Sequence, residues 1–551
     1  MKKKVLALAL SIVMVLSLMA GCSPSNDDET SKSAGDKETT SGATQTTDAP
    51  TDAPTETEPQ EIAVDHFAGT TIEVVVVKKN NDLSTDWNEK EIFKRAEEAT
   101  GIHVEWTVID PSVSKDKIAV LLMSDDQPDV YLGALNENLM LSNLELFYDL
   151  SEEGLLETYA PKVVEDYNAI DGAWAALKWM DGSIRSLFTG AVVGGVGDYI
   201  NSSLIINTEW LKKINKDIPT TADELYEVLV AFRDGDMDGD GDTKDEIPMS
   251  FCSGYWEAEF MMLANAFGIG GNRTQDDTDH YKNIKDGKVV STVDTDNFRA
   301  FLEFHHKLYK EGLLDVEGFS QTSAQYSTKR KEKNLGVCLT YNNMMGNGYE
   351  PFIYQGMEGV EPLLSGLVDP ITGSRTSFCI SAESENVEAV LHWWNWMHKD
   401  QETKNIAWGG LEYFDVIDGK YYEKKSADRP EGYNAQTYGM HNYCPALLPG
   451  ERAATDNSQP PNSVRMEFIE ANKNLVNQEG FPVAFGDPEA AEERAFMESE
   501  LFAYIKTFTA NAVVNGVTDA SWDQHLKELK AVEYYDWLQW YQDFVDEVNS
   551  R

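Results

Sequence analysis

Short β-type runs alternate with helical patterns between residues 71 and 132, and this alternation constrains the fold more than any other feature of the chain. Residues 71–77 form a run of β-branched residues, as expected of a strand buried on both faces. The region predicts, in order, a strand at 71–77, a helix from Asp86 to Thr100 that Gly101 ends, a strand at 102–109, a helix at 114–124 and a strand at 128–132. This order implies an α/β fold with a largely parallel sheet and right-handed crossovers.

The ends of these strands indicate where a ligand would bind. In open α/β sheets, ligands bind beyond the carboxyl ends of the strands. Residues 133–138 follow directly after the third predicted strand. We therefore expect this segment to form one edge of a binding cleft.

A second α/β unit begins near Tyr199, and the body contains no tandem repeat. Its first elements are a strand at 204–207 and a helix at 208–214. The next helix has Thr221 as its N-cap, and Glu224 is placed to complete a capping box. Further strands are predicted at 247–252 and 335–339, and further helices at 295–312, 386–399 and 532–548.

The N-terminus has the pattern of a lipoprotein signal peptide. Lys2, Lys3 and Lys4 precede an apolar run at 5–18, and Met19-Ala20-Gly21-Cys22 follows it. A transmembrane anchor is the alternative, but the run is shorter than the roughly 18–20 residues that span a bilayer. We predict a signal peptide at 1–22 with a lipidated Cys22, and two or more acyl chains would give a stable membrane anchor.

Residues 23–61 are expected to be a disordered tether. They are Ser, Thr, Asp, Glu, Pro and Gly with almost no large apolar side chain. Such a segment cannot bury enough surface to offset its ordering entropy. As a coil it would reach roughly 30–35 Å. Lipid, tether and globular body together predict a protein held at the outer face of a membrane.

Composition limits what the body, residues 62–551, can be. It is long enough for two or three ordinary domains or one large bilobed one, and we expect a monomer. The net charge of −48 argues against nucleic acid, because no basic cluster could neutralise phosphates. Cys252, Cys338, Cys379 and Cys444 have no CxxC or metal spacing, so they are interpreted as buried free thiols, and no disulfide is assigned.

An acidic loop at 234–248 predicts a structural calcium site. Its aspartates alternate with glycines, which lets the loop wrap hard oxygen ligands around one cation. A solvated turn is the alternative, but so many carboxylates would repel one another without a counter-ion. The predicted ligands of Ca²⁺ are Asp236, Asp238, Asp240, Asp242, Asp245 and Glu246.

Two registers of this loop are possible. One starts at Asp234 and places Asp245 at the twelfth position, where EF-hands have a bidentate Glu. The other starts at Asp236, and Asp245 and Glu246 then close the cage early. We favour the second register. A single loop indicates a structural ion that stiffens the turn before the strand at 247–252.

Several phrases together give the chain a recognisable resemblance. They are LIINTEWL at 204–211, IPTTADEL at 218–225, DEIP at 245–248, AFG at 266–268 and LYKEGLLD at 308–315. In this order they resemble the extracellular solute-binding proteins (family 1) of carbohydrate ABC importers, and most closely the large Gram-positive lipoproteins with a calcium loop. The likeness is strong between about 200 and 420 and weaker in the last hundred residues.

The resemblance implies a two-lobed, periplasmic-binding-protein-like α/β fold with discontinuous lobes joined by a hinge. The N-terminal lobe is expected at 62–190 and 376–435, and the C-terminal lobe at 191–375 and 436–551. The chain would cross between them near 186–200 and near 375. The first crossing departs from the family, because residues 188–199 lack its common Gly-x-Pro phrase. The implied protein is no enzyme: it captures a sugar or oligosaccharide and delivers it to a permease in the cell membrane.

Aromatic side chains after predicted strands are the best candidates to hold a sugar, because C–H patches of sugar rings stack on aromatic faces. One group follows the strand at 247–252, and the other follows the strand at 335–339. Weaker candidates lie elsewhere, and clusters with helical spacing such as Trp393 and Trp396 are interpreted as core. The ligand-binding candidates are Tyr255, Trp256, Glu257, Tyr341 and Asn342, followed by Trp174, Tyr199, Trp408 and Tyr413.

Two other functions compete with the binding protein. A lipid-anchored glycoside hydrolase would need two carboxylates about 5–10 Å apart, for which Glu257 and Asp198 are candidates. A surface adhesion module usually carries calcium loops in tandem, and this sequence has one. No HExxH, GxSxG or phosphate-binding loop supports another enzyme class.

Overall fold

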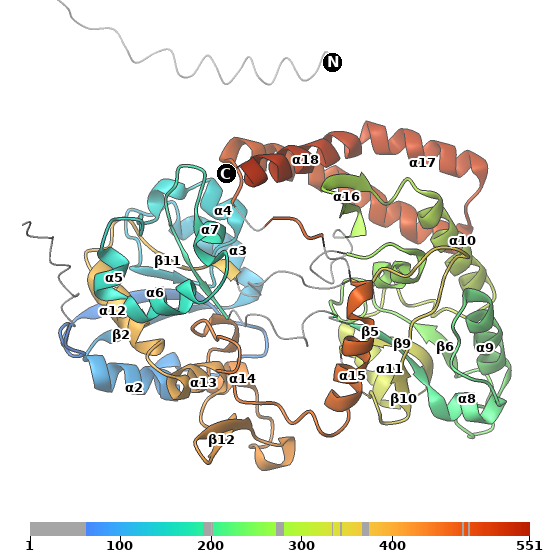
Figure 1. Cartoon of the computed structure of the whole chain (residues 1–551), viewed down its shortest axis with the longest axis horizontal. Coiled ribbons are helices and arrows are strands. Elements are labelled where there is room, and N and C mark those ends of the chain that lie inside the picture. Colours follow the sequence, from blue (N-terminus) through green and yellow to red (C-terminus); the bar gives the residue numbers. More distant parts are fainter. Residues whose placement is uncertain are drawn as a thin grey trace, which may run out of the picture. The chain divides into compact units, whose positions relative to one another are not determined.

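Two hydrophobic cores organise the chain, each built on its own β-sheet (Figure 1). The computed structural model describes residues 62–190, 200, 202–271, 280–332, 334–341, 344–365, 374–476, 479–482 and 485–550. The expected signal peptide, the tether, Tyr199, Asp198 and Asn342 lie outside these residues. No helix in the described part is long and apolar enough to cross a membrane.

The first lobe contains a five-stranded sheet in the order β2-β1-β3-β11-β4. β1 pairs in parallel with β2 and β3, as predicted, but β11 is antiparallel to both β3 and β4. The sheet is therefore mixed, not largely parallel, because a strand from late in the sequence inserts between two early ones. The strands are β1 (Thr71–Val77), β2 (His103–Ile109), β3 (Val130–Leu132), β4 (Leu187–Thr189) and β11 (Ser374–Ile380).

Helices cover both faces of this sheet. Alternation along β1 sends Val74 and Val76 into one buried cluster and Val75 into another on the opposite face. Burial on both faces does not extend to Thr71 and Glu73, which are exposed. The helices of this lobe are α2 (Glu91–Thr100), α3 (Ser114–Leu121), α4 (Glu137–Leu141), α5 (Leu155–Tyr159), α6 (Pro161–Asn168), α7 (Ala173–Leu177), α12 (Val387–Met397), α13 (Gln401–Gly409) and α14 (Ala435–Tyr438).

The second lobe contains a four-stranded sheet in the order β10-β5-β9-β6. Only β6 and β9 run in parallel within it. Its strands are β5 (Ser203–Asn207), β6 (Ile247–Ser250), β9 (Leu335–Thr340) and β10 (Tyr349–Pro351), and the helices beside them are α8 (Thr208–Ile214), α9 (Ala222–Asp234), α10 (Asp296–Lys310) and α11 (Ser323–Glu332). The remaining described strands form two separate hairpins outside both large sheets. They are β7 (Lys282–Lys285) with β8 (Lys288–Ser291), and β12 (Phe414–Ile417) with β13 (Lys420–Glu423).

The start of α9 differs in one detail from the predicted capping box. Thr221 caps the helix by accepting a hydrogen bond from the backbone N–H of Glu224. The Glu224 carboxylate, however, accepts from the N–H and the hydroxyl of Thr220. Its return bond therefore lies one residue before the N-cap.

The C-terminal helices form a layer beside α10 (Figure 1). Tyr534 and Trp537 of the predicted terminal stripe are fully buried there, and Trp393 and Trp394 are fully buried in the first lobe. The four cysteines of the body are buried and free, as predicted. The helices of this layer are α16 (Pro488–Asn515), α17 (Asp519–Ala531) and α18 (Tyr534–Ser550), whereas α15 (Asn462–Asn472) contacts β10 instead.

The expected lobe boundary at residue 435 is wrong. Met440, Tyr443 and Ala453 belong to the buried cluster of the first lobe. Ala454 still bonds to Tyr421 and Glu423 in the β12–β13 hairpin, whereas Pro460 packs against Gly346 of the second lobe. The chain therefore returns to the second lobe between Ala454 and Pro460. Part of the segment after 435 lies at the carboxyl end of β1, where Tyr443 bonds to Val77.

Candidate ligand-binding site

A pocket of about 250 Å³ lies at the carboxyl ends of β1 and β3 in the first lobe. The sequence predicted this edge from the residues after β3, and Gly133 and Leu135 do line the pocket. Because β11 is antiparallel to β3, its first residues reach the same edge. The other lining residues are Lys79, Thr189, Gly190, Ser374, Ser377, Trp408, His441, Asn442 and Tyr443.

Tyr443 forms the floor of this pocket by packing where Gly133 has no side chain. Gly133 has a positive φ of +59°, and a Cβ there would lie 2.1 Å from the tyrosine ring. The Tyr443 hydroxyl donates a 2.6 Å hydrogen bond to the carbonyl of Val77 at the end of β1. The Lys79 ammonium lies 5.1 Å from the centre of the same ring. The segment that contains Tyr443, distant in the sequence, is thus fixed onto the carboxyl ends of β1 and β3.

Trp408, a predicted ligand residue, stands on one wall of the pocket. Its ring centre lies 4.0 Å from that of His441, and the Arg452 guanidinium lies 5.4 Å from the indole. Burial, together with the charges of Arg452 and Lys79, lowers the pKa of His441 to about 4. The imidazole is therefore neutral at pH 7. Sequence reasoning missed Lys79, His441 and Arg452, because nothing in their local patterns distinguishes them.

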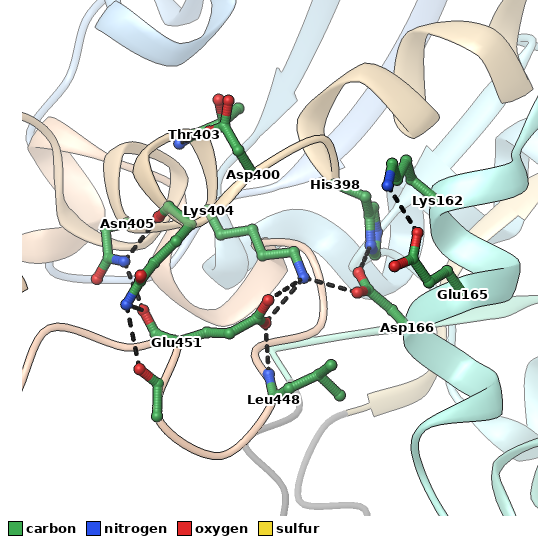
Figure 2. A network of polar contacts seen from close by, with 12 residues as sticks. Lys162, Glu165, Asp166, His398, Asp400, Thr403, Lys404, Asn405, Leu448 and Glu451 are labelled. Carbon is green, nitrogen blue, oxygen red and sulfur yellow. Dashed lines mark hydrogen bonds and ion pairs between the residues drawn. The ribbon is translucent and has the colours of Figure 1, made fainter. Parts of the chain in front are cut away.

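A buried polar network holds this wall in place (Figure 2). Asp166 of α6 accepts hydrogen bonds from His398 Nδ1 at 2.5 Å and from Lys404 Nζ at 2.8 Å. Lys404 also contacts both carboxylate oxygens of Glu451, at 2.8 and 2.9 Å. Glu451 directly precedes Arg452, and Lys404 lies one helical turn before Trp408 on α13. The network therefore sets the positions of both pocket side chains.

An exposed aromatic pair lies at one edge of the second sheet. β6 and β9 are parallel, so the residues that follow them meet at that edge. Trp256 is 49% exposed, and its ring centre lies 6.0 Å from that of Tyr341, so two of the predicted ligand residues lie side by side. The Arg465 guanidinium covers the Tyr341 ring at 4.1 Å and donates to the carbonyl of Ile200 at 3.0 Å.

Glu257, another predicted ligand residue, is buried in a network of hydrogen bonds. Its side chain is buried, and its oxygens accept hydrogen bonds from both terminal nitrogens of Arg330 at 2.7 and 3.1 Å. Burial alone would raise the pKa of Glu257, but the Arg330 charge and hydrogen bonds lower it to about 2. It also accepts from the Tyr255 hydroxyl, Thr340 Oγ1 and the Tyr341 N–H. Glu257 thus positions the aromatic residues around it.

Two of the weaker candidates, Trp174 and Tyr413, do not line the first-lobe pocket. Trp174 of α7 packs against Tyr167 and donates its indole N–H to Asn168, and it does not line the first-lobe pocket. Tyr413 is buried in the first core. Tyr199 and Asn342 lie outside the described residues.

The acidic loop has the geometry of a cation cage. Asp236, Asp238 and Glu246 form one cluster of converging carboxylate oxygens, and Asp238, Asp240 and Asp245 form another, with all oxygens of a cluster within 4.8 Å. Gly239 and Gly241 have positive φ angles of +92° and +94°, which permit the tight turns. Desolvation raises the pKa of Asp245, and the charges of Asp240, Asp238 and Asp242 add to the rise.

Glu246 helps to distinguish the two possible registers of this loop. It is 8% exposed, and one oxygen accepts from the Met237 N–H at 2.5 Å, whereas Oε2 is buried with no hydrogen-bond partner in the described part of the chain. Asp234 turns away and pairs with Arg233 at 2.7 Å. Both observations favour the register that starts at Asp236.

Comparisons with known proteins agree with this arrangement. The family model described as "Bacterial extracellular solute-binding protein" matches residues 82–404, more than half of the chain. The chain belongs to this family. The fructooligosaccharide ABC transporter substrate-binding protein FusA of Streptococcus pneumoniae is 28% identical over 494 residues, 85% of this chain and 88% of FusA. Lipoprotein LipO of Bacillus subtilis is 27% identical over 45% of this chain and 46% of its own length.

Solved structures of this solute-binding protein's relatives share its two-lobed α/β fold. FusA in complex with kestose gives a TM-score of 0.75 at 24% identity, covering 87% of this chain and 100% of FusA. FusA has also been solved as an EF-hand mutant with fructo-nystose, with a TM-score of 0.73. An HMO-binding solute-binding protein of Bifidobacterium longum infantis gives 0.74 at 20% identity, covering 87% of this chain and 98% of its own. The predicted family and fold class are therefore confirmed.

Proposed function

We propose that this solute-binding protein captures a saccharide between its lobes and delivers it to the membrane permease of an ABC importer. The exposed Trp256 beside Tyr341 carries the proposal, because a large exposed indole at a strand-end edge suits stacking against a sugar ring. The pocket at the corresponding edge of the first lobe supplies a second half-site. The relationship to FusA supports both the ligand class and the importer.

Calorimetry with purified full-length protein tests this function. We expect saturable binding of an oligosaccharide and about thirtyfold weaker affinity in Trp256→Ala, since truncating a central aromatic contact costs on the order of 2 kcal/mol. Tyr422→Ala is the matched control, because Tyr422 is 40% exposed on the β12–β13 hairpin and does not line the first-lobe pocket. Equal affinity in Trp256→Ala and the unsubstituted protein would contradict the proposed contact.

We expect this protein to bind its saccharide without cleaving it. Glu257, the described member of the expected hydrolase pair, is paired with Arg330 and has a pKa of about 2, so it does not supply a proton at neutral pH. Chromatography of the saccharide after incubation should therefore recover it unchanged. Any cleaved product would support the glycoside hydrolase instead.

The acidic loop, on this proposal, holds a structural Ca²⁺. The unpartnered, buried Oε2 of Glu246 supports it, because a buried carboxylate oxygen is costly unless a hydrogen bond or a cation satisfies it. Aspartate and glutamate oxygens are the ligands that calcium prefers. The EF-hand in FusA is in keeping with this assignment.

Lipidation of Cys22 would place the protein at the outer face of the cell membrane of a Gram-positive bacterium, within reach of its permease. The leader pattern and the relative named as a lipoprotein support this placement. Cells grown with labelled palmitate should incorporate label into the native protein. Cys22→Ser should abolish the label and release the protein into the medium, whereas the conservative change Cys252→Ser, at a buried thiol, should do neither.

A further inference from the structure

We infer that the saccharide carries an anionic group, bound at the first-lobe pocket by Lys79 and by Arg452 beside it. This inference rests on the proposed saccharide-binding function and names the class of saccharide. The cations are positioned by separate segments, one after β1 and one after the network residue Glu451. Lys79 lines the pocket and lies 5.1 Å from the Tyr443 ring, and Arg452 lies 5.4 Å from the ring of Trp408, which also lines the pocket.

Neither cation has an ion-pair partner within the described residues. Lys79 is exposed and Arg452 is half-buried, and each lies against an aromatic ring. Partial loss of hydration lowers the pKa of Lys79. This loss disfavours the charged ammonium, and a bound anion would offset it.

The two cations are linked through the pocket residues Trp408 and His441. His441 and Lys79 line the same pocket, and the Trp408 ring contacts both His441, at 4.0 Å, and Arg452, at 5.4 Å. The charges of both cations contribute to the lowered pKa of His441. An arginine can donate two parallel hydrogen bonds to a carboxylate, sulfate or phosphate, and a lysine adds a compact charge.

The rest of the pocket lining contains no carboxylate among the described residues. Ser377 Oγ and His441 Nδ1 are buried and have no hydrogen-bond partner. The hydroxyls of a neutral sugar both donate and accept, so a site for such a sugar gains from carboxylate acceptors. An ionised acidic group only accepts. Ammonium, guanidinium and hydroxyl donors without a competing carboxylate therefore match an acidic sugar better than a neutral one.

Paired ligands test the inference by calorimetry on the full-length protein. Trigalacturonate is compared with its fully methyl-esterified form, a sulfated with an unsulfated neutral disaccharide, and glucose 6-phosphate with glucose. We expect at least one acidic member to bind tenfold or more tightly than its neutral partner, with an affinity that falls as NaCl rises. The pair whose acidic member binds more tightly identifies the acidic group as carboxylate, sulfate or phosphate.

Variants then locate the anion. Lys79→Gln and Arg452→Gln should each weaken the acidic ligand tenfold or more and leave a neutral ligand within twofold. Lys216→Gln should change neither, because Lys216 lies on the surface, paired with Glu227. Trp256→Ala should weaken acidic and neutral ligands alike.

Each contrary outcome overturns a stated part of this proposal. If neutral saccharides bind as tightly as their acidic partners, the anionic class is wrong and the saccharide-binding function stands. If an acidic ligand binds but both glutamine variants retain it, the assignment to Lys79 and Arg452 is wrong. If no saccharide of either kind binds, the proposed function and the inference fall together.

Discussion

Glu257 is the residue on which the aromatic half-site depends. Its buried carboxylate neutralises Arg330 and accepts from the Tyr341 N–H, so it joins α11 to the end of β9. Glu257→Gln leaves the guanidinium without a charge partner. We expect the free energy of unfolding to fall by about 3–5 kcal/mol, as is typical when one member of a buried ion pair is removed. Urea denaturation measures this, and Glu227→Gln, in the exposed pair with Lys216, should cause no measurable change.

The pH dependence of stability separates this charge effect from a loss of packing. The pKa of Glu257 is about 2 in the folded protein against an ordinary value of 4.5. Its stabilising contribution is therefore fully present above pH 4.5 and is lost as the pH falls toward 2. Denaturation of Glu257→Gln should depend less on pH in this window. Parallel curves for the two proteins would contradict the assigned role.

The position of a single residue was predictable from sequence only where a neighbouring strand determines it. Trp256 and Tyr341 follow strands, and that alone brought them to the correct edge. Lys79, His441 and Arg452 come from three separate segments and meet only in the folded lobe. Glu257 was assigned wrongly because its neighbours in sequence are aromatic, whereas its partner Arg330 is distant in the chain.

Among the elements, the acidic loop gives the sharpest test. It joins α9 to β6, and β6 leads to Trp256, so an empty cage should loosen this edge of the second sheet. We expect EGTA to lower the melting temperature by roughly 5 °C, since an ion at a hundredfold its Kd stabilises a fold by about 2.7 kcal/mol. Glu246→Gln should reduce this difference between calcium and EGTA, because it removes the charge of the buried ligand.

Asp234→Asn is the matched control for the calcium loop. Asp234 lies in the same acidic run but pairs with Arg233 outside the converging oxygens. Its melting temperature should therefore show the full response to EGTA. If EGTA leaves the melting temperature of the unsubstituted protein unchanged, the loop holds no structural calcium.

Element boundaries followed from local signals, whereas pairing did not. β1 and α8 begin and end where the sequence predicts, because a β-branched run defines the strand and Asn207 caps the helix. The antiparallel insertion of β11 between β3 and β4 was not predictable, since pairing with strands more than 180 residues earlier leaves no local pattern.

Across the whole molecule, the lobes are linked by more than their crossings. Phe485, just before α16, is fully buried and stacks on Trp179 of the first lobe at 3.7 Å, while Arg375 covers its ring at 4.4 Å. α16 itself packs against α10 of the second lobe. The sequence did not reveal this link, because Phe485 stands in a short segment before α16 and its partners Trp179 and Arg375 are distant in the chain.

Replacing Phe485 by alanine should uncouple the two lobes. A buried Phe→Ala change costs about 3–5 kcal/mol, and Phe485 lies in a buried cluster on one face of the first sheet, so the cost falls where the segment before α16 is held against the first lobe. We expect thermal unfolding followed by calorimetry to broaden or split into two transitions, because each lobe keeps its own sheet and buried cluster. Phe496→Ala provides the control, since Phe496 lies on α16 and is 77% exposed. A single sharp transition at an unchanged temperature in Phe485→Ala would mean that the crossings alone couple the lobes.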